Sequence, residues 1–81
     1  MYMSERCGYC QSALHLLARK GVGNIDSIDV DKEPAQRAMM TARTGRRTVP
    51  QVFIGEQHVG GFDDMAALEL QGRLDGLLSS N

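Results

Sequence analysis

The sequence predicts an α/β fold in which helices flank a four-stranded mixed sheet, with the elements in the order β-α-β-α-β-β-α. Stretches with apolar residues at helical spacing alternate with short segments of β-type pattern, and glycines separate them. A parallel β-α-β unit followed by a helix and a hairpin gives each apolar stripe a sheet face to cover. The 81 residues suffice for one domain, expected over 1–81, and are too few for two.

The helices are predicted from apolar residues that recur three and four positions apart. The first helix is expected over 8–20 and ends at glycines. Its stripe comprises Cys10, Ala13, Leu14 and Leu17. A second helix opens at Pro34 and ends at Gly45. Its stripe comprises Ala35, Ala38, Met39 and Ala42. A last helical region has Asp63 or Asp64 as its cap. Its core residues lie on either side of Gly72 and are Met65, Leu68, Leu70, Leu74, Leu77 and Leu78.

Four short strands are predicted around these helices. Residues 1–4 fit a strand that leads into the cysteine segment, and residues 28–31 alternate apolar and polar side chains, as a half-buried strand does. Residues 52–54 form a continuous apolar run, which a glycine turn connects to the segment 57–59 as a β-hairpin. The resulting order of elements is that of the thioredoxin-like architecture.

Composition and charge exclude several classes of function. The net charge is −1 and the basic residues are spread along the chain, so the sequence does not favour nucleic-acid binding. No apolar run approaches the roughly 20 residues that span a bilayer, so no membrane segment is expected. The N-terminus has neither the basic flank nor the apolar run of a secretory signal. We therefore expect a cytoplasmic protein.

Both cysteines of the chain lie in one segment, Cys7-Gly8-Tyr9-Cys10, at the start of the first predicted helix. Cys7 faces unpaired backbone N–H groups and the positive end of the helix dipole, which favour thiolate over thiol. Cys10 shares the apolar stripe and is expected to be more buried and less ionised. The spacing predicts Cys7 as the nucleophile of a disulfide exchange and Cys10 as the thiol that resolves the mixed disulfide.

A zinc site and a structural disulfide account for the two cysteines less well. Structural zinc needs two further ligands, and only His15 and His58 remain, without a spacing typical of zinc ligands. A purely structural disulfide across so short a loop adds little stability. Both histidines are therefore interpreted as surface residues, and Arg43, Arg46 and Arg47 as solvated charges.

Three motifs stand in order along the chain: Cys7-Gly8-Tyr9-Cys10, Thr48-Val49-Pro50-Gln51 and Gly60-Gly61-Phe62-Asp63-Asp64. With them the chain resembles the glutaredoxin family, specifically its short dithiol bacterial type, over nearly its whole length. The resemblance implies an enzyme with glutathione as co-substrate and electron donor. Its expected substrates are protein–glutathione mixed disulfides and protein disulfides such as those of ribonucleotide reductase, and it is expected to be a monomer.

The resemblance also implies a glutathione site. Pro50 is expected to follow a cis bond that exposes the backbone of Val49 to an extended ligand. The helix start at 60–64 fits the γ-glutamyl end of glutathione, with Asp64 accepting from its ammonium group, and Arg37 fits the glycine carboxylate. The implied site residues are Tyr9, Arg37, Thr48, Val49, Pro50, Gly61, Phe62, Asp63 and Asp64.

Two positions depart from the family pattern. Ser4 stands where many relatives have lysine, so thiolate stabilisation would depend more on Arg6, Arg37 and the helix terminus. Gly8 replaces the commonest proline of the motif. Family members with small residues there include homodimers that bind a [2Fe-2S] cluster through the first cysteine of each subunit and two glutathiones. Cluster binding by Cys7 in such a dimer, for cluster transfer or sensing, is therefore the alternative function, and no other metal is expected.

Overall fold

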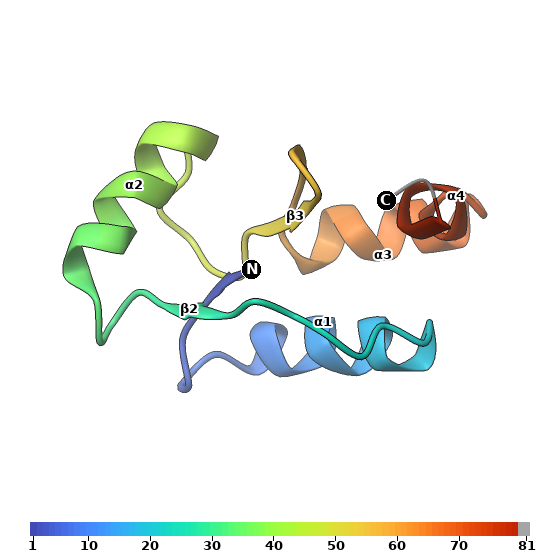
Figure 1. Cartoon of the computed structure of the whole chain (residues 1–81), viewed down its shortest axis with the longest axis horizontal. Coiled ribbons are helices and arrows are strands. Elements are labelled where there is room, and N and C mark those ends of the chain that lie inside the picture. Colours follow the sequence, from blue (N-terminus) through green and yellow to red (C-terminus); the bar gives the residue numbers. More distant parts are fainter. Residues whose placement is uncertain (80–81) are drawn as a thin grey trace.

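The structure is a computed structural model that describes residues 1–79. It contains β1 (Tyr2–Met3), α1 (Gly8–Arg19), β2 (Ile28–Asp29), α2 (Pro34–Thr44), β3 (Val52–Ile54), β4 (Gln57–Gly60), α3 (Phe62–Leu70) and α4 (Leu74–Ser79). The strands lie in the middle, with α2 on one side and α1, α3 and α4 on the other (Figure 1). This arrangement confirms the predicted α/β class.

The predicted strands are all present, and they form two ladders instead of one continuous sheet. β1 pairs with β2 in parallel, and β3 pairs with β4 antiparallel. A single backbone pair joins the ladders: Tyr2 N–H donates to Gln51 O at 3.0 Å, and Gln51 N–H donates to Tyr2 O at 3.1 Å. β2 is shorter than predicted because the Asp29 carboxylate accepts from the backbone N–H of Asp31 at 2.9 Å, which turns the chain.

The core consists of two apolar clusters on opposite faces of the strands. Alternation along β3 assigns its side chains, since Val52 and Ile54 join one cluster and Phe53 packs against the other. The first cluster connects α1, β3, α3 and α4 and comprises Ala13, Leu16, Leu17, Val52, Ile54, Met65 and Leu74. The second lies under α2 and comprises Tyr2, Val30 and Met40.

The predicted face of α1 is nearly correct and that of α2 is wrong. In α1, Leu16 is buried while Leu14 is only half-buried; the other three predicted positions are buried. In α2 all four residues of the predicted stripe are exposed, and Met40 is the buried one. Alanine contributes little apolar area, so a single large side chain, Met40, decides which face of α2 meets the sheet.

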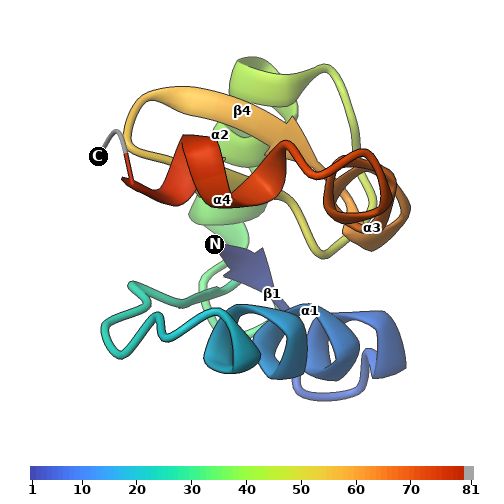
Figure 2. The same ribbon diagram turned by 90° about the vertical axis from the view of Figure 1, so that its right-hand side faces the viewer.

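The last helical region is two helices, where the sequence predicted one. Gly72 has φ +70, a left-handed conformation that ends α3. The N–H of Arg73 then donates to Leu68 O at 2.9 Å, closing the end of the helix. Figure 2 shows α4 turned away from the axis of α3. Leu74 of α4 belongs to the same apolar cluster as Ile54 of β3. No helix within residues 1–79 is long and apolar enough to cross a membrane.

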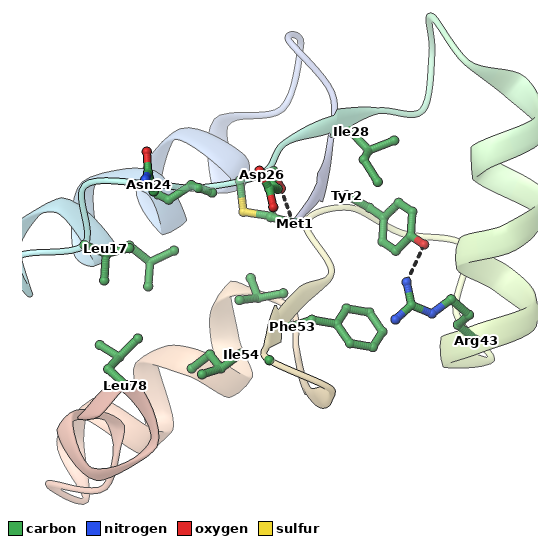
Figure 3. A pocket seen from close by; sticks show the side chains of 14 residues that line it. Met1, Tyr2, Leu17, Asn24, Asp26, Ile28, Arg43, Phe53, Ile54 and Leu78 are labelled. Carbon is green, nitrogen blue, oxygen red and sulfur yellow. Dashed lines mark hydrogen bonds between the residues drawn. The ribbon is translucent and has the colours of Figure 1, made fainter. Parts of the chain in front are cut away.

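A cavity of about 520 Å³ lies between the segment before β2 and strand β3 (Figure 3). Arg43 closes one end by donating to Tyr2 Oη at 2.8 Å, and its guanidinium lies 4.2 Å from the centre of the Phe53 ring. Arg43 is exposed, as a solvated charge should be, yet its cation–π contact also supports the second cluster. Neither cysteine lines this cavity, so the thiol chemistry belongs elsewhere.

The contrast between two leucines tests the core. Leu74 is 0% exposed and Leu70 is 90% exposed. We expect Leu74→Ala to lower the free energy of unfolding by about 2–5 kcal/mol, because it leaves a cavity in the cluster. Leu70→Ala, the same chemical change at the surface, should lower it by less than about 0.5 kcal/mol. Urea titration followed by circular dichroism measures both, and equal losses would contradict the assignment of the core.

Candidate redox site

Cys7 is the N-cap of α1. Its backbone is extended, with φ −102 and ψ 112, and its Sγ accepts the backbone N–H of Cys10 at 3.2 Å. The sulfur therefore occupies the place where a capping oxygen usually satisfies a free N–H of the first turn. This hydrogen bond and the positive end of the helix dipole both favour a negative sulfur. Cys7 is half-buried, so a reaction partner can reach it.

Cys10 lies inside the first turn and is 0% exposed. Burial raises the pKa of its thiol to about 12, and the hydrogen bond to the Cys7 side chain and the charge of Cys7 act in the same direction. A backbone hydrogen bond with Ser4 opposes them. At neutral pH Cys10 is therefore a protonated thiol, as the sequence predicted, while Cys7 has the geometry of the more reactive one.

The segment before β3 brings a third element to the cysteines. The Val49–Pro50 peptide bond is cis, which confirms the expectation for Pro50. The Cys7 thiol lies 3.5 Å from Val49 O and can donate to it. Val49 also lines a groove of about 320 Å³. It is lined by Tyr9, Arg46, Thr48, Val49, Pro50, Gln51, Gly61, Phe62, Asp63 and Asp64. The three sequence motifs thus meet at one groove beside Cys7.

Asp64 fixes the wall of the groove at the start of α3. Its Oδ2 accepts the backbone N–H of Gly61 at 2.9 Å and the guanidinium of Arg46 at 2.7 Å. The Arg46 hydrogen bond, followed by that of Gly61, lowers the pKa of the Asp64 carboxyl. Gly60 has φ +119, and a Cβ there would lie 2.3 Å from Asp64 Oδ2. Only glycine at position 60 leaves room for this carboxylate. The N-cap of α3 is Gly61, so the prediction of Asp63 or Asp64 as the cap residue is wrong; Asp64 is the third helical residue, and its side chain accepts the N–H of the N-cap, as in a capping box.

The structure brings eight of the nine implied glutathione-site residues to the groove and does not bring Arg37. The Arg37 guanidinium donates to Arg47 O at 3.0 Å and pairs with Asp31 at 3.0 Å. Arg46, predicted as a solvated charge, lines the groove instead. Its position two residues before Thr48 is the only sequence signal that pointed to it.

Ser4 organises the cysteine loop by hydrogen bonds, without the charge of a lysine. Its side chain is buried and its hydroxyl donates to the Asp31 carboxylate, whose pKa is lowered by this bond first and then by Arg37. The Ser4 carbonyl oxygen accepts the backbone N–H of Cys7 at 3.2 Å. The backbone N–H of Arg6 lies 3.3 Å from Ser4 Oγ. The backbone N–H of Arg6 thus bonds to Ser4, and the charges of Arg37 and Arg6 also lower the pKa of Asp31.

Sequence reasoning missed the pairing of His58 with Gln51, a buried residue of the groove lining. His58 was predicted at the surface, yet it is half-buried and its Nε2 lies 2.8 Å from Oε1 of the buried Gln51. Burial first, and then the charge of Arg46, lower the pKa of the imidazole. His15 is exposed, as predicted. Within residues 1–79 no three His, Cys, Asp or Glu side chains are grouped so that they could hold a metal ion.

A Cys-x-x-Cys segment that starts a helix, beside a cis proline that precedes a strand, defines a thiol redox protein of the thioredoxin-like fold. Comparison with known proteins makes this class specific. The glutaredoxin family model matches residues 1–59.

The similar proteins agree with the family model. A glutaredoxin of Neisseria meningitidis serogroup A is 52% identical over 79 residues, covering 98% of this chain and 93% of that protein. Glutaredoxin 3 of Escherichia coli K12 is 47% identical over 78 residues, covering 96% and 93%. The crystal structure of the buckwheat glutaredoxin–glutathione complex matches with a TM-score of 0.89 at 34% identity, covering 98% of this chain and 74% of that one. The chain belongs to the glutaredoxin family, and its function is glutathione-dependent thiol redox chemistry.

The different environments of the two thiols can be tested by alkylation. At neutral pH iodoacetamide should modify Cys7 and leave Cys10 unmodified, because Cys10 is buried and its pKa is raised to about 12. Peptide mass spectrometry identifies the adduct. In Cys7→Ser the remaining thiol should react only after urea is added. Native Cys7→Ser that reacts as fast as the wild type would overturn the assignment.

The Arg46–Asp64 pair predicts a pH-dependent contribution to stability. Because the pKa of Asp64 in the folded state is lowered, the pair stabilises the protein above the ordinary Asp pKa of about 3.9, and the contribution is lost as pH falls below it. Both side chains are nearly half exposed, so the gain should not exceed about 1 kcal/mol. The test is urea titration of wild type and Arg46→Ala between pH 3 and pH 7, in steps of about one unit. The difference in their free energies of unfolding should be present at neutral pH and become smaller as the pH falls toward about 3.

Arg47→Ala is the matched control for this pair, because the Arg47 side chain forms no ion pair within residues 1–79. Its stability difference from wild type should stay constant with pH. A gap for Arg46→Ala that is equally constant would show that the ion pair does not set the pKa of Asp64.

Proposed function

We propose that this protein is a glutathione–disulfide oxidoreductase that reduces protein–glutathione mixed disulfides and protein disulfides, with Cys7 as nucleophile and Cys10 as resolving thiol. The observation that carries the proposal is the half-buried Cys7 sulfur at the start of α1, which accepts Cys10 N–H at 3.2 Å and lies 3.5 Å from the carbonyl oxygen of Val49, a residue that lines the groove. This sulfur has the helix-start geometry of a reactive thiol and lies next to a site for a peptide-like ligand.

The first reaction is disulfide exchange at Cys7. The thiolate attacks the glutathione sulfur of a mixed disulfide; a Cys7–glutathione disulfide forms, and the protein sulfur leaves with the electron pair and takes up a proton. The thiolate of a second glutathione then attacks the Cys7–glutathione disulfide at the glutathione sulfur. Oxidised glutathione leaves and the Cys7 thiolate is restored. This route uses Cys7 alone.

A protein disulfide requires the second thiol. Cys7 attacks one sulfur of the substrate, and Cys10, after losing its proton, attacks Cys7 in the resulting mixed disulfide. The substrate leaves as a dithiol, and the Cys7–Cys10 disulfide is reduced by two glutathiones. Disulfides of the kind found in ribonucleotide reductase are the expected substrates. Glutathione as electron donor fits a reducing compartment such as the cytoplasm. It also fits a reduction potential of about −200 to −230 mV for the Cys7–Cys10 disulfide.

The groove supports glutathione as the ligand. Its volume of about 320 Å³ lies at the lower end of the range for ligand pockets, as a tripeptide requires. In the proposed pose the backbone of Val49 pairs with the extended peptide, Asp64 accepts from the γ-glutamyl ammonium, and Arg46, which lines the groove where Arg37 does not, binds a carboxylate. Tyr9 and Phe62, whose ring centres lie 6.3 Å apart, form an apolar wall beside the thiolate.

The proposal is tested by NADPH oxidation coupled through glutathione reductase, with a glutathionylated peptide as substrate. Cys7→Ser should reduce turnover to background. Cys10→Ser should retain activity on this substrate and lose it on a protein with an intramolecular disulfide, because only the second reaction uses Cys10. Equal activity of the two variants on the glutathionylated peptide would contradict the assignment of the nucleophile.

The same protein preparation also distinguishes the oxidoreductase from the alternative function, cluster binding by a homodimer. Wild-type protein without turnover would contradict the oxidoreductase proposal. If that protein became brown and dimeric after anaerobic reconstitution with iron, sulfide and glutathione, a [2Fe-2S] homodimer held by Cys7 would replace it. A colourless monomer that turns over the peptide would exclude the cluster function.

A further inference from the structure

Gln51 is a buried polar residue whose side chain points toward the groove segment from below. It is 1% exposed, and its backbone is fixed by the pair of hydrogen bonds with Tyr2. Its Nε2 lies 3.0 Å from the carbonyl oxygen of Thr48 and 3.3 Å from Thr48 Oγ1. Its Oε1 lies 2.8 Å from His58 Nε2. Both ends of the amide are therefore hydrogen-bonded, as a buried amide requires.

These contacts fix which atoms carry hydrogens. The Thr48 carbonyl oxygen can only accept, so the nitrogen end of the Gln51 amide must face it. The amide oxygen then faces His58, and since that oxygen also only accepts, the imidazole Nε2 must donate. Burial and the nearby charges of Arg46 and Arg43 hold the pKa of His58 below its usual value, against the opposing charge of Asp64. Neutral His58 is thus the tautomer with hydrogen on Nε2.

We propose that His58 and Gln51 are positioning residues that act in series, holding the Thr48–Val49 backbone in the conformation that lines the groove at Cys7. His58 donates to Gln51, Gln51 donates to Thr48, and the next residue, Val49, places its carbonyl oxygen 3.5 Å from Cys7 Sγ. Neither side chain needs to touch the thiol; Gln51 lines the groove but is 1% exposed, and His58 is not among the lining residues. We call the His58–Gln51–Thr48 series the amide relay.

The far end of the amide relay is anchored in the hairpin. The register pairs His58 with Phe53, and their ring centres lie 5.0 Å apart. The Phe53 ring is in turn covered by the guanidinium of Arg43, on the side drawn in Figure 3. His58 is therefore held by a tilted ring contact with Phe53 as well as by its hydrogen bond.

The proposal deepens the proposed function, on which its kinetic test rests. Replacing the donor with His58→Leu should raise KM for a glutathionylated peptide about five- to tenfold, the cost of one neutral hydrogen bond. His58→Gln places an N–H where Nε2 was and should stay within about twofold of wild type. Gln51→Met, which removes both polar ends, should match His58→Leu.

Two readouts separate positioning from a purely structural role. The kcat and the rate of Cys7 alkylation should stay within about twofold of wild type in all three variants, because the start of α1 is untouched. The KM effects of His58→Leu and Gln51→Met should not add in the double variant, since both break one series. Additive effects, or an equal loss in His58→Leu and His58→Gln, would overturn the proposal.

Nuclear magnetic resonance tests the amide relay without a measurement of enzyme activity. Long-range ¹H–¹⁵N spectra of wild type should show the Nε2–H tautomer of His58, and backbone resonances of Thr48 and Val49 should shift in His58→Leu and stay in place in His58→Gln. An Nδ1–H tautomer, or unmoved loop resonances in His58→Leu, would overturn the proposal even in an active enzyme. Wild type that lacks turnover while these spectra agree would count against the proposed function alone.

Discussion

The backbone pair between Tyr2 and Gln51 is the constraint on which the site depends. It is the one pairing within residues 1–79 that joins the β1–β2 ladder to the β3–β4 hairpin. Tyr2 precedes Cys7 by one short loop, and Gln51 directly follows Pro50. Two hydrogen bonds of 3.0 and 3.1 Å therefore fix the distance between the cysteine segment and the proline segment, which no local preference of either segment could set.

Each half of the molecule then contributes what the other lacks. The β-α-β half supplies a helix start and its free N–H groups, which stabilise the Cys7 sulfur. The other half supplies Val49, which lines the groove, and the carboxylate of Asp64 at the start of α3, and neither of these is reactive by itself. The apolar cluster that includes Ala13, Val52 and Met65 holds the halves together, so the geometry of the groove is a property of the core.

The parts of the structure that follow from local chemistry could be predicted from the sequence. The positions of Cys7 and Cys10 depend on helix geometry alone, whereas the cis bond at Pro50 and the groove were expected only from the family resemblance that the three motifs carry. Two predictions were wrong because they depend on packing. The buried face of α2 is set by the contact of Met40 with Tyr2 and Val30. The chain breaks at Gly72 because α4 packs in a different direction from α3. Arg46 and Arg37 carry the same charge in the sequence, and only the fold determines which one reaches Asp64. His58 and Gln51 gave no periodic signal, because their partners are chosen across a hairpin.

The causes of the raised pKa of Cys10 change during the proposed cycle. Burial is the largest, but the hydrogen bond to Cys7 and the negative charge of Cys7 also contribute. Once the Cys7 sulfur is bonded to a substrate, it bears no charge and is a poorer hydrogen-bond partner, while the burial remains. Cys10 then becomes more acidic at the stage when it must attack, and it stays protonated when Cys7 is free. The order of the two attacks thus follows in part from the loss of charge and of a hydrogen-bond partner at Cys7 when its sulfur is bonded to the substrate.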